Sequence, residues 1–158
     1  MTDVRRATPD DAAVLARLLW DFNTEFETET DDADVLAARF SRILGLPGVF
    51  AVLAEERAED GPDAVGFALV TLRPAIWFDG PVSQLEELYV VPALRDRGIG
   101  TRVLDLCKEL AREQGSPEMH INVDEDDVDT RRFYERHGWV NVEPGVDYRM
   151  LCYVGPTT

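Results

Sequence analysis

The feature that most constrains the fold is a junction at residues 85–113, where an apolar, β-rich run gives way to a short loop and then to an amphipathic helix. Such a junction directs several backbone N–H groups and the positive end of a helix dipole at one point, which is how proteins hold phosphate groups. Gly98 and Gly100 permit a tight turn and keep side chains away from an anion. Cationic forks surround the same point, those of Arg95, Arg97 and Arg102. The sequence therefore predicts a phosphate-binding loop.

Two familiar phosphate loops do not match this junction. A P-loop needs a lysine followed by Ser or Thr after its second glycine, whereas Gly100 is followed by Thr101 and Arg102. A Rossmann fingerprint needs three glycines early in a βαβ unit, and this loop carries two glycines late in the chain. The loop therefore belongs to another class of phosphate site.

The loop resembles the R-x-x-G-x-G signature of the GCN5-related N-acetyltransferases (GNAT), read as Arg95-x-x-Gly98-x-Gly100. Residues 133–139, FYERHGW, resemble a second element of that family, a helix end that carries Tyr, Glu and a Gly followed by an aromatic residue. The two elements stand in the family's order, with one helix and one strand expected between them. The resemblance covers residues 3–154 and is diagnostic from residue 85 to residue 139.

The expected order of elements is also that of the family, β-α-α-β-β-β-α-β-α-β-β. This is an α/β (α+β) fold in a single domain, residues 1–158, with a central mixed, mostly antiparallel sheet of about seven strands and four helices. Helices are expected from Thr8, at 33–44, from the phosphate loop to Gly115, and at 127–137. Strands are expected at 3–7, 49–56, 64–73, 85–91, 119–123, 139–142 and 148–154, with a turn at 60–63.

Composition narrows the partners. A chain of 158 residues that is 45% hydrophobic can bury a real core. It has no apolar run long enough to span a membrane and no secretory leader, so we expect a cytoplasmic protein. Its formal charge of −15 argues against nucleic acid as a partner and leaves room for a cationic substrate. Cys107 and Cys152 are expected to be buried thiols, and we expect no metal site.

The resemblance implies acetyl-coenzyme A (acetyl-CoA) as donor, with its pyrophosphate on the amides of residues 97–101 and its pantetheine arm along the strand edge at 88–91. The family often has Asn and Ala where Asp127 and Thr130 stand here, and Asp127 can still cap its helix. The cofactor-binding residues implied are Leu88, Tyr89, Val90, Val91, Arg95, Asp96, Arg97, Gly98, Ile99, Gly100, Thr101, Asp127, Thr130 and Phe133.

Acetyl transfer to an amine needs a base, because an alkyl ammonium has a pKa near 10. Glu86 and Glu87 are the candidates, and strict alternation along a strand predicts that only one faces the site. The sequence favours Glu86, because Leu85-Glu86-Glu87 resembles the Leu-Glu-Asp of diamine and polyamine acetyltransferases in the family. The resemblance implies that Tyr134 is the general acid that protonates the leaving thiolate.

The acceptor is expected beside the first helix, the acidic segment that follows it and the segment before the fourth strand. The candidate residues for binding it are Trp20, Glu25, Phe26 and Trp77. The hypothesis favoured is direct attack in a ternary complex by a primary amine of a small cationic molecule, such as a polyamine, a diamine or an aminoglycoside-like compound. The alternatives are acetylation of a protein N-terminus or lysine, and a non-catalytic CoA-binding module. A homodimer formed through residues 139–154 is left open.

Overall fold

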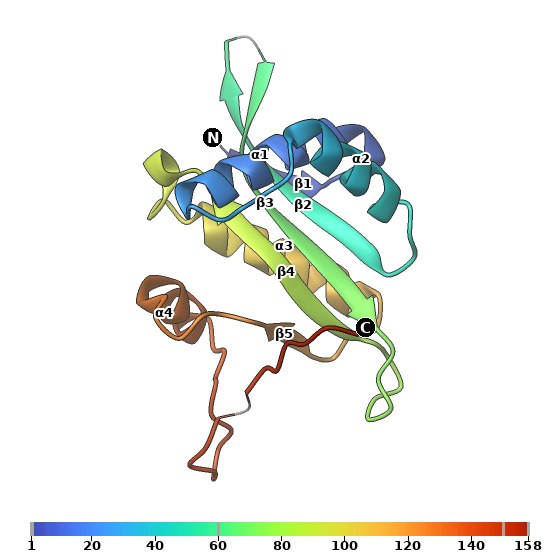
Figure 1. Ribbon diagram of the computed structural model, residues 1–158, viewed down its shortest axis with the longest axis vertical. Helices are drawn as coiled ribbons and strands as arrows, with labels where there is room; N and C mark the ends of the chain where they lie inside the picture. Colours follow the sequence, from blue (N-terminus) through green and yellow to red (C-terminus); the bar gives the residue numbers. More distant parts are fainter. Residues whose placement is uncertain (1, 60, 150, 158) are drawn as a thin grey trace. The chain divides into compact units, whose positions relative to one another are not determined.

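The computed structural model describes residues 2–59, 61–149 and 151–157, and the chain divides into two compact units after His120. The first unit contains β1 (Thr2–Arg6), α1 (Ala12–Glu25), α2 (Ala33–Ile43), β2 (Val49–Ala58), β3 (Gly61–Arg73), β4 (Val82–Val90) and α3 (Ile99–Glu113) (Figure 1). β5 (Met119–Ile121) follows, and the second unit contains α4 (Val128–Arg136).

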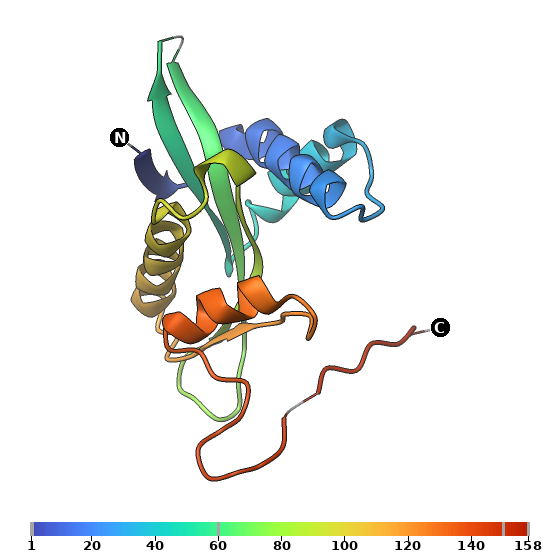
Figure 2. The same cartoon turned by 90° about the vertical axis from the view of Figure 1, so that its left-hand side faces the viewer.

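The strands form one sheet in the order β1-β2-β3-β4-β5, and the first three pairings are antiparallel. α1 and α2 pack on one face of the sheet and α3 packs on the other (Figure 2). The predicted α+β class with a central sheet and four helices is confirmed, although the sheet has five strands instead of about seven. The turn predicted at 60–63 is wrong for residues 61–63, which belong to β3 and pair with residues 56–58 of β2; Asp60 lies outside the described residues.

Each face of the sheet buries one helical stripe that the sequence spacing predicts. Leu15 and Leu18 of α1 are fully buried in the core that also contains Phe67 and Tyr89 of the sheet. On the other face the buried side chains of α3 recur at helical spacing, those of Ile99, Val103, Leu104, Cys107 and Ala111. Burial raises the pKa of the Cys107 thiol to about 12, as expected for a structural cysteine.

The start of the first helical segment is fixed by charge. Thr8 and Asp11 form a capping box around a short 3-10 turn, Pro9–Asp11, so the N-cap predicted at Thr8 is confirmed. Arg5 of β1 bonds the Asp11 carboxylate at 2.8 Å through both terminal nitrogens, and its Nε bonds Glu55 of β2 at 2.8 Å. The Arg5 guanidinium holds the pKa of Asp11 well below its usual range. This network joins β1, β2 and the start of α1.

The two C-terminal strands predicted at 139–142 and 148–154 are wrong for the residues that the structure describes, 139–149 and 151–157; Met150 lies outside them. A segment with alternating apolar residues forms a strand only where a neighbouring strand pairs with its backbone. The described residues of these two segments form turns and irregular chain instead. Val140 and Tyr153 are exposed as a result. Cys152 is exposed as well, so its predicted burial is also wrong.

The connection before β4 makes the tightest backbone contact at any described glycine. A Cβ added to Gly80 would lie 1.9 Å from the carbonyl oxygen of Gly115, at the end of α3. We expect Gly80→Ala to lower the free energy of unfolding by about 1–3 kcal/mol, because two backbones must move apart. Urea denaturation measures this. Gly155→Ala, whose Cβ meets no atom within 4 Å, is the control. Equal stability of Gly80→Ala and wild type would contradict the packing.

Candidate active site

The loop between β4 and α3 is shaped by two left-handed residues. After a 3-10 turn at Pro92–Leu94, Asp96 takes a φ of +60° and Gly98 a φ of +77°. Glycine adopts this conformation without a Cβ penalty, and aspartate is among the few other residues that tolerate it. Left-handed residues in such a turn direct successive N–H groups to one side and form a concave site for an anion. Gly98 then caps the N-terminus of α3.

The amides of this loop are unpaired. The N–H groups of Arg97, Gly98, Ile99 and Gly100 donate no hydrogen bond to any described residue. The first bond of α3 runs from the Arg102 N–H to the Gly98 carbonyl, at 3.1 Å. A Cβ on Gly98 would meet no atom within 4 Å, so the space beside Gly98 itself is open. Unpaired donors at the positive end of a long helix fit a phosphate group.

The Arg95 guanidinium does not extend over the loop, contrary to the prediction. Its two terminal nitrogens each bond the Glu25 carboxylate at 2.7 Å, and its Nε donates to the Val90 carbonyl at 2.9 Å. The same guanidinium lies 5.7 Å from the centre of the Tyr89 ring. Arg95 therefore joins the loop to the end of α1.

The other two arginines differ from each other. Nη1 of Arg102 donates to the Thr2 carbonyl of β1 at 2.6 Å, so the cationic fork predicted there is also directed at the protein. Arg97 is exposed and forms no hydrogen bond or ion pair with any described residue. Arg97 is thus the one arginine of the three whose guanidinium is available to an anion at this loop.

Only alternate residues at the end of β4 present their amides to the outer edge. Val91 donates its N–H to a β3 carbonyl at 2.9 Å, and Tyr89, two residues earlier, directs its N–H the same way. The N–H groups of Leu88 and Val90 therefore point away from β3. The predicted edge at 88–91 is corrected to these two residues, because the sheet uses the amides of Tyr89 and Val91.

β5 accompanies only the first part of β4. The Ser83 N–H donates to the Glu118 carbonyl at 3.0 Å, and the buried hydroxyls of Ser83 and Ser116 bond the same carbonyl. A strand of three residues, Met119–Ile121, spans only about 10 Å. Starting beside Ser83, it is too short to reach Val90, so β5 does not pair with the outer edge at the end of β4.

β4 contains a β-bulge at Glu86. Leu69 of β3 pairs with Glu87, whereas the next residue, Val70, pairs with Leu85, so Glu86 has no partner in the ladder. A bulge of this kind interrupts the regular alternation of side chains along a strand. It occurs in the segment where the sequence predicts the catalytic base.

The bulge brings both carboxylates to one face of the sheet. Glu87 lies on the face of its partner Leu69, which packs against the core beneath α1 and α2. Thr71, two residues along β3, shares that face and donates its hydroxyl to the Glu86 carboxylate. The prediction that Glu86 and Glu87 face opposite sides is therefore wrong, because the extra residue of the bulge interrupts the alternation of side chains.

The two acids differ in environment. Burial raises the pKa of Glu87 to about 7, and the neighbouring Glu86 carboxylate adds to the rise. Glu86 is exposed. A carboxyl that titrates near neutral pH is suited to general acid–base chemistry, because it exists in both protonation states at working pH. The electrostatics thus distinguish two acids that the sequence cannot.

In the second unit, Tyr134 lies on the last turn of α4 and is held by the helix end. Gly138 (φ +90°) donates to the Glu135 carbonyl at 3.1 Å, and Trp139 donates to the Tyr134 carbonyl at 3.1 Å, which together form a Schellman motif. The Trp139 and Tyr134 rings lie 6.1 Å apart, and Phe133 packs edge-on against Tyr134 at 5.2 Å. The FYERHGW pattern therefore ends the helix and fixes the tyrosine ring.

The start of α4 is capped as predicted. The Asp127 carboxylate accepts a hydrogen bond from the Thr130 N–H at 3.1 Å. An aspartate at this position satisfies one of the unpaired amides of the first turn and suits the helix dipole. The Asp127 oxygen is therefore already used by the helix, and its predicted contact with a donor stays a prediction, as do those of Thr130 and Phe133.

Three of the four predicted acceptor residues lie along α1 or at its end, and their role in binding the acceptor stays a prediction. Glu25 is paired with Arg95, and Phe26 packs edge-on against Phe22 at 5.2 Å, at the end of α1. Trp20 is 42% exposed on α1, and Trp77 is 85% exposed in the connection from β3 to β4. No ring contact joins either tryptophan to another aromatic residue within the described chain. The structure leaves both tryptophans at the surface.

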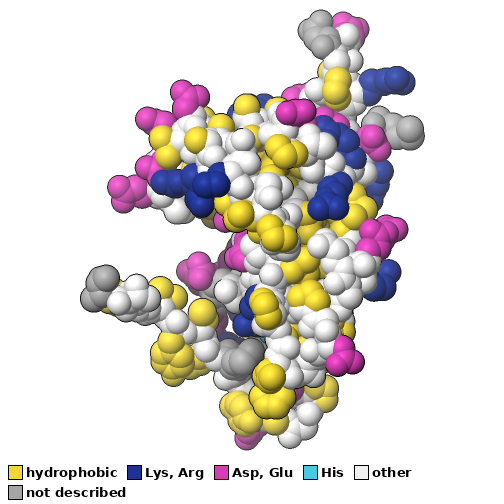
Figure 3. All heavy atoms as spheres, turned by 90° about the vertical axis from the view of Figure 1, so that its right-hand side faces the viewer, with side chains coloured by type: hydrophobic (Ala, Val, Ile, Leu, Met, Phe, Trp, Pro, Cys, Tyr) yellow, Lys and Arg dark blue, Asp and Glu magenta, His cyan; other side chains and the backbone are white. Residues whose placement is uncertain are grey.

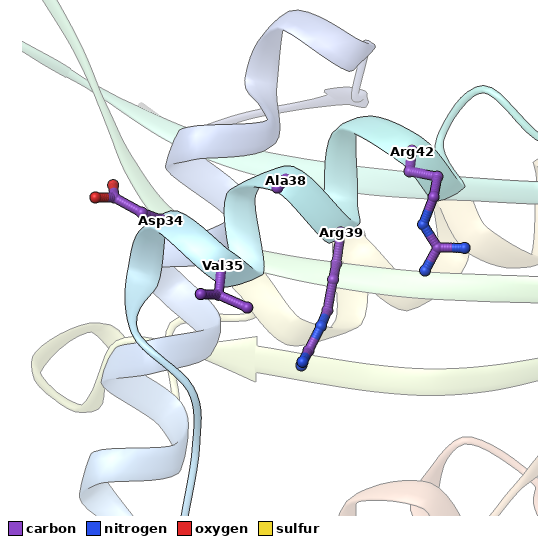
Figure 4. Close-up of a pocket in the computed structure, with 5 residues that line it drawn as sticks. All are labelled: Asp34, Val35, Ala38, Arg39 and Arg42. Atoms are coloured by element: carbon purple, nitrogen blue, oxygen red, sulfur yellow. The ribbon is translucent and has the colours of Figure 1, made fainter.

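Other surface features carry no matching chemistry. A shallow hollow lies along α2, lined by Asp34, Val35, Ala38, Arg39 and Arg42 (Figure 4). These side chains come from one helix, and none is a predicted site residue. Acidic and basic side chains alternate with apolar ones on the face in Figure 3. Across residues 2–59, 61–149 and 151–157 there is no cluster of metal-ligating side chains, and no helix there is long and apolar enough to cross a membrane.

Comparison with known proteins decides the family. The model of the GNAT acetyltransferase family matches residues 13–139. The chain belongs to this family. It is therefore an acyltransferase of the GNAT class, and the loop, the bulged strand and α4 all lie within the matched residues.

Curated GNAT relatives include enzymes of amino sugars. The aminoglycoside N(6')-acetyltransferase type 1 of Klebsiella aerogenes is 31% identical over 102 residues, which are 63% of this chain and 62% of that enzyme. The chain thus matches less than two thirds of that relative's length. Glucosamine 6-phosphate N-acetyltransferase 1 of Oryza sativa subsp. japonica is 32% identical over 115 residues, 72% of this chain and 68% of that enzyme.

Solved GNAT structures share the fold over nearly the whole chain. A candidate acetyltransferase from Arthrobacter sp. FB24 is 42% identical with a TM-score of 0.86, covering 98% of this chain and 95% of that one. The aminoglycoside N-acetyltransferase AAC(6')-Iy in complex with CoA is 20% identical with a TM-score of 0.74, and 96% of each chain is covered. The second likeness concerns the fold alone.

The raised pKa of Glu87 predicts a pH-dependent stability. The folded protein keeps a proton on Glu87 that the unfolded chain loses above pH 4.5, so stability falls as the pH rises from 4.5 to about 7. We expect Glu87→Gln to leave the free energy of unfolding unchanged at pH 4 and to raise it by about 1 kcal/mol at pH 8, after allowance for solvent screening. Urea titrations at both pH values measure this, and Glu109→Gln, at an exposed position of α3, is the control. Parallel pH profiles for Glu87→Gln and wild type would contradict the shift.

Proposed function

We propose that this protein is an acetyl-CoA-dependent N-acetyltransferase that acts on a primary amine of a small cationic molecule, by direct attack in a ternary complex. The observation that carries the proposal is the continuous segment 86–100, which holds a near-neutral carboxyl, an open strand edge and a loop of unpaired amides in that order. Amine acetylation needs a base, backbone donors that hold an extended donor molecule, and a site for its anionic groups.

The residues present fit coenzyme A. The amides of Arg97–Gly100 and the Arg97 guanidinium would hold its pyrophosphate, and the outward amides of Leu88 and Val90 would bond the pantetheine arm. When bound, acetyl-CoA supplies an acetyl group activated as a thioester. The chain's own part is to hold the donor beside the bulge of β4 and to manage the protons of the amine and the thiol.

Glu87 is the base in this proposal. A substrate ammonium has a pKa near 10, and a carboxylate with a pKa of about 7 accepts its proton more readily than an ordinary acid does. Glu86, on the same face, adds negative charge that attracts the ammonium. The sequence favours Glu86 as base, whereas the burial of Glu87 supports the neighbouring residue in that role.

Tyr134 is the proposed general acid. The phenol is a weak enough acid to stay protonated until a thiolate appears. Its ring is held from two sides by Phe133 and Trp139, so it is rigid in its own unit. The assignment rests on the family resemblance of residues 133–139 together with this local support.

Amino sugars and small polyamines are the acceptor classes we favour. The two curated relatives act on amines of sugars, as their names state, and two carboxylates on one face suit a cationic amine. A cytoplasmic location and a homodimer remain predictions.

Thiol release from acetyl-CoA tests the function. The acceptor panel holds aminoglycosides, glucosamine 6-phosphate, polyamines, amino acids and short peptides. We expect turnover on a small amine. Turnover confined to peptides would favour a protein acetyltransferase, and CoA binding without turnover on any acceptor would favour a non-catalytic module.

The pH dependence of turnover tests the base. We expect kcat/KM to fall below about pH 7, because protonated Glu87 cannot accept the amine's proton. Glu87→Gln is expected to lower kcat by about 100-fold or more, whereas Glu86→Gln changes mainly the KM of the acceptor. A larger kcat loss in Glu86→Gln than in Glu87→Gln would return the role to Glu86.

Removal of one hydroxyl tests the acid. We expect Tyr134→Phe to lower kcat by about 10–100-fold while the KM for acetyl-CoA changes little. Trp139→Phe serves as a control for ring packing, since it keeps an aromatic contact beside Tyr134. Full activity of Tyr134→Phe would remove Tyr134 from the mechanism.

A further inference from the structure

The guanidinium of Arg95 forms the most extensive side-chain network around the proposed donor loop. It bonds Glu25 in a bidentate pair at 2.7 Å, donates Nε to Val90 at 2.9 Å and lies over the Tyr89 ring. All three guanidinium nitrogens are therefore engaged. The residues joined are 70 positions apart in the chain, at the end of α1 and at the start of the loop.

This network lies at the start of the loop. Arg95 is the first residue after the Pro92–Leu94 turn, and the unpaired amides of residues 97–100 lie shortly after it. The bond from Nε to the Val90 carbonyl folds Arg95 back onto the end of β4. The direction in which the loop leaves the strand is thus fixed by a side chain that Glu25 holds in place.

We propose that Glu25 is a positioning residue for the donor loop, acting through Arg95, and is not a ligand of the acceptor. The proposal rests on the proposed function in that the loop binds CoA. Both oxygens of the Glu25 carboxylate accept a hydrogen bond from Arg95, and the same carboxylate interacts with the Tyr89 hydroxyl. An acidic side chain next to the acceptor-side segment therefore serves the opposite substrate.

The geometry is of the kind that contributes at a surface. Isolated exposed ion pairs add little, but bidentate Arg–carboxylate pairs within a network are the exception. The side chains of Arg95 and Glu25 are 39% and 27% exposed. Glu25→Gln keeps the shape of the side chain and loses the charge, so it loosens Arg95 without leaving a cavity. We expect it to weaken CoA binding by about fivefold.

A competing account predicts that Glu25→Gln strengthens CoA binding instead of weakening it. If Arg95 were a phosphate ligand that Glu25 withholds, Glu25→Gln would release it and CoA would bind more tightly. Arg95→Lys distinguishes the two accounts further, because it keeps the cation and loses the fork. Under the positioning account, Glu25→Gln, Arg95→Lys and the double variant all weaken CoA binding by a similar factor, because each breaks the same unit.

The experiment is calorimetric titration of each variant with CoA in the absence of acceptor, followed by the KM of both substrates. Asp31→Asn is the matched control: it breaks an exposed ion pair to Arg39, 2.6 Å long, in the same acidic segment and away from the loop. Thermal unfolding of each variant establishes that it is folded. We expect a raised Kd for CoA in Glu25→Gln, an unchanged acceptor KM, and a control like wild type.

Several results would overturn the proposal. They are an unchanged or lowered Kd for CoA in Glu25→Gln, a raised acceptor KM in its place, additive losses in the double variant, or the same loss in Asp31→Asn. Failure of the wild-type protein to bind CoA would overturn the donor assignment itself, and is thereby distinguished from a failure confined to Glu25.

Discussion

The β-bulge at Glu86 is the constraint on which the rest of the active site depends. One extra residue in β4 places two carboxylates on the same face of the sheet, and burial, together with the neighbouring Glu86 carboxylate, raises the pKa of Glu87. The same strand presents alternate amides at its outer edge, and the loop that follows it contains the left-handed residue Gly98. The proposed base, the strand edge and the proposed anion loop therefore lie in one continuous segment of the chain.

Charge in this protein is used locally and specifically. The formal charge of −15 suggests a general attraction for cations, yet the best-placed acids have definite partners: Asp11 bonds Arg5, Glu25 bonds Arg95, and Asp31 bonds Arg39. Of the acids we assign to chemistry, Glu87 stands out because it is partly buried without a cation. The net charge thus does not indicate where the site is, whereas the burial of one carboxyl, which raises its pKa, marks it as a candidate functional residue.

Local patterns were predictable, and long-range pairings were not. The turn at Gly98, the cap at Asp127 and the helix end at Gly138 each follow from a backbone rule that acts within a few residues. The bulge depends on the register of β3, and the partner of Arg95 comes from α1, so neither is visible in the local sequence. The strands predicted at 139–142 and 148–154 failed for the same reason, because apolar alternation does not supply a neighbouring strand.

The most direct test of this account is the titration of the Glu87 side-chain carboxyl by carbon-13 NMR, with Glu87→Gln used to assign the resonance. The account predicts a midpoint near pH 7, and a lower midpoint in Glu86→Gln, since that substitution removes the neighbouring charge. A midpoint near the ordinary value of 4.5 would contradict it. The carboxyl would then be an ordinary surface acid, and the bulge would not create a base.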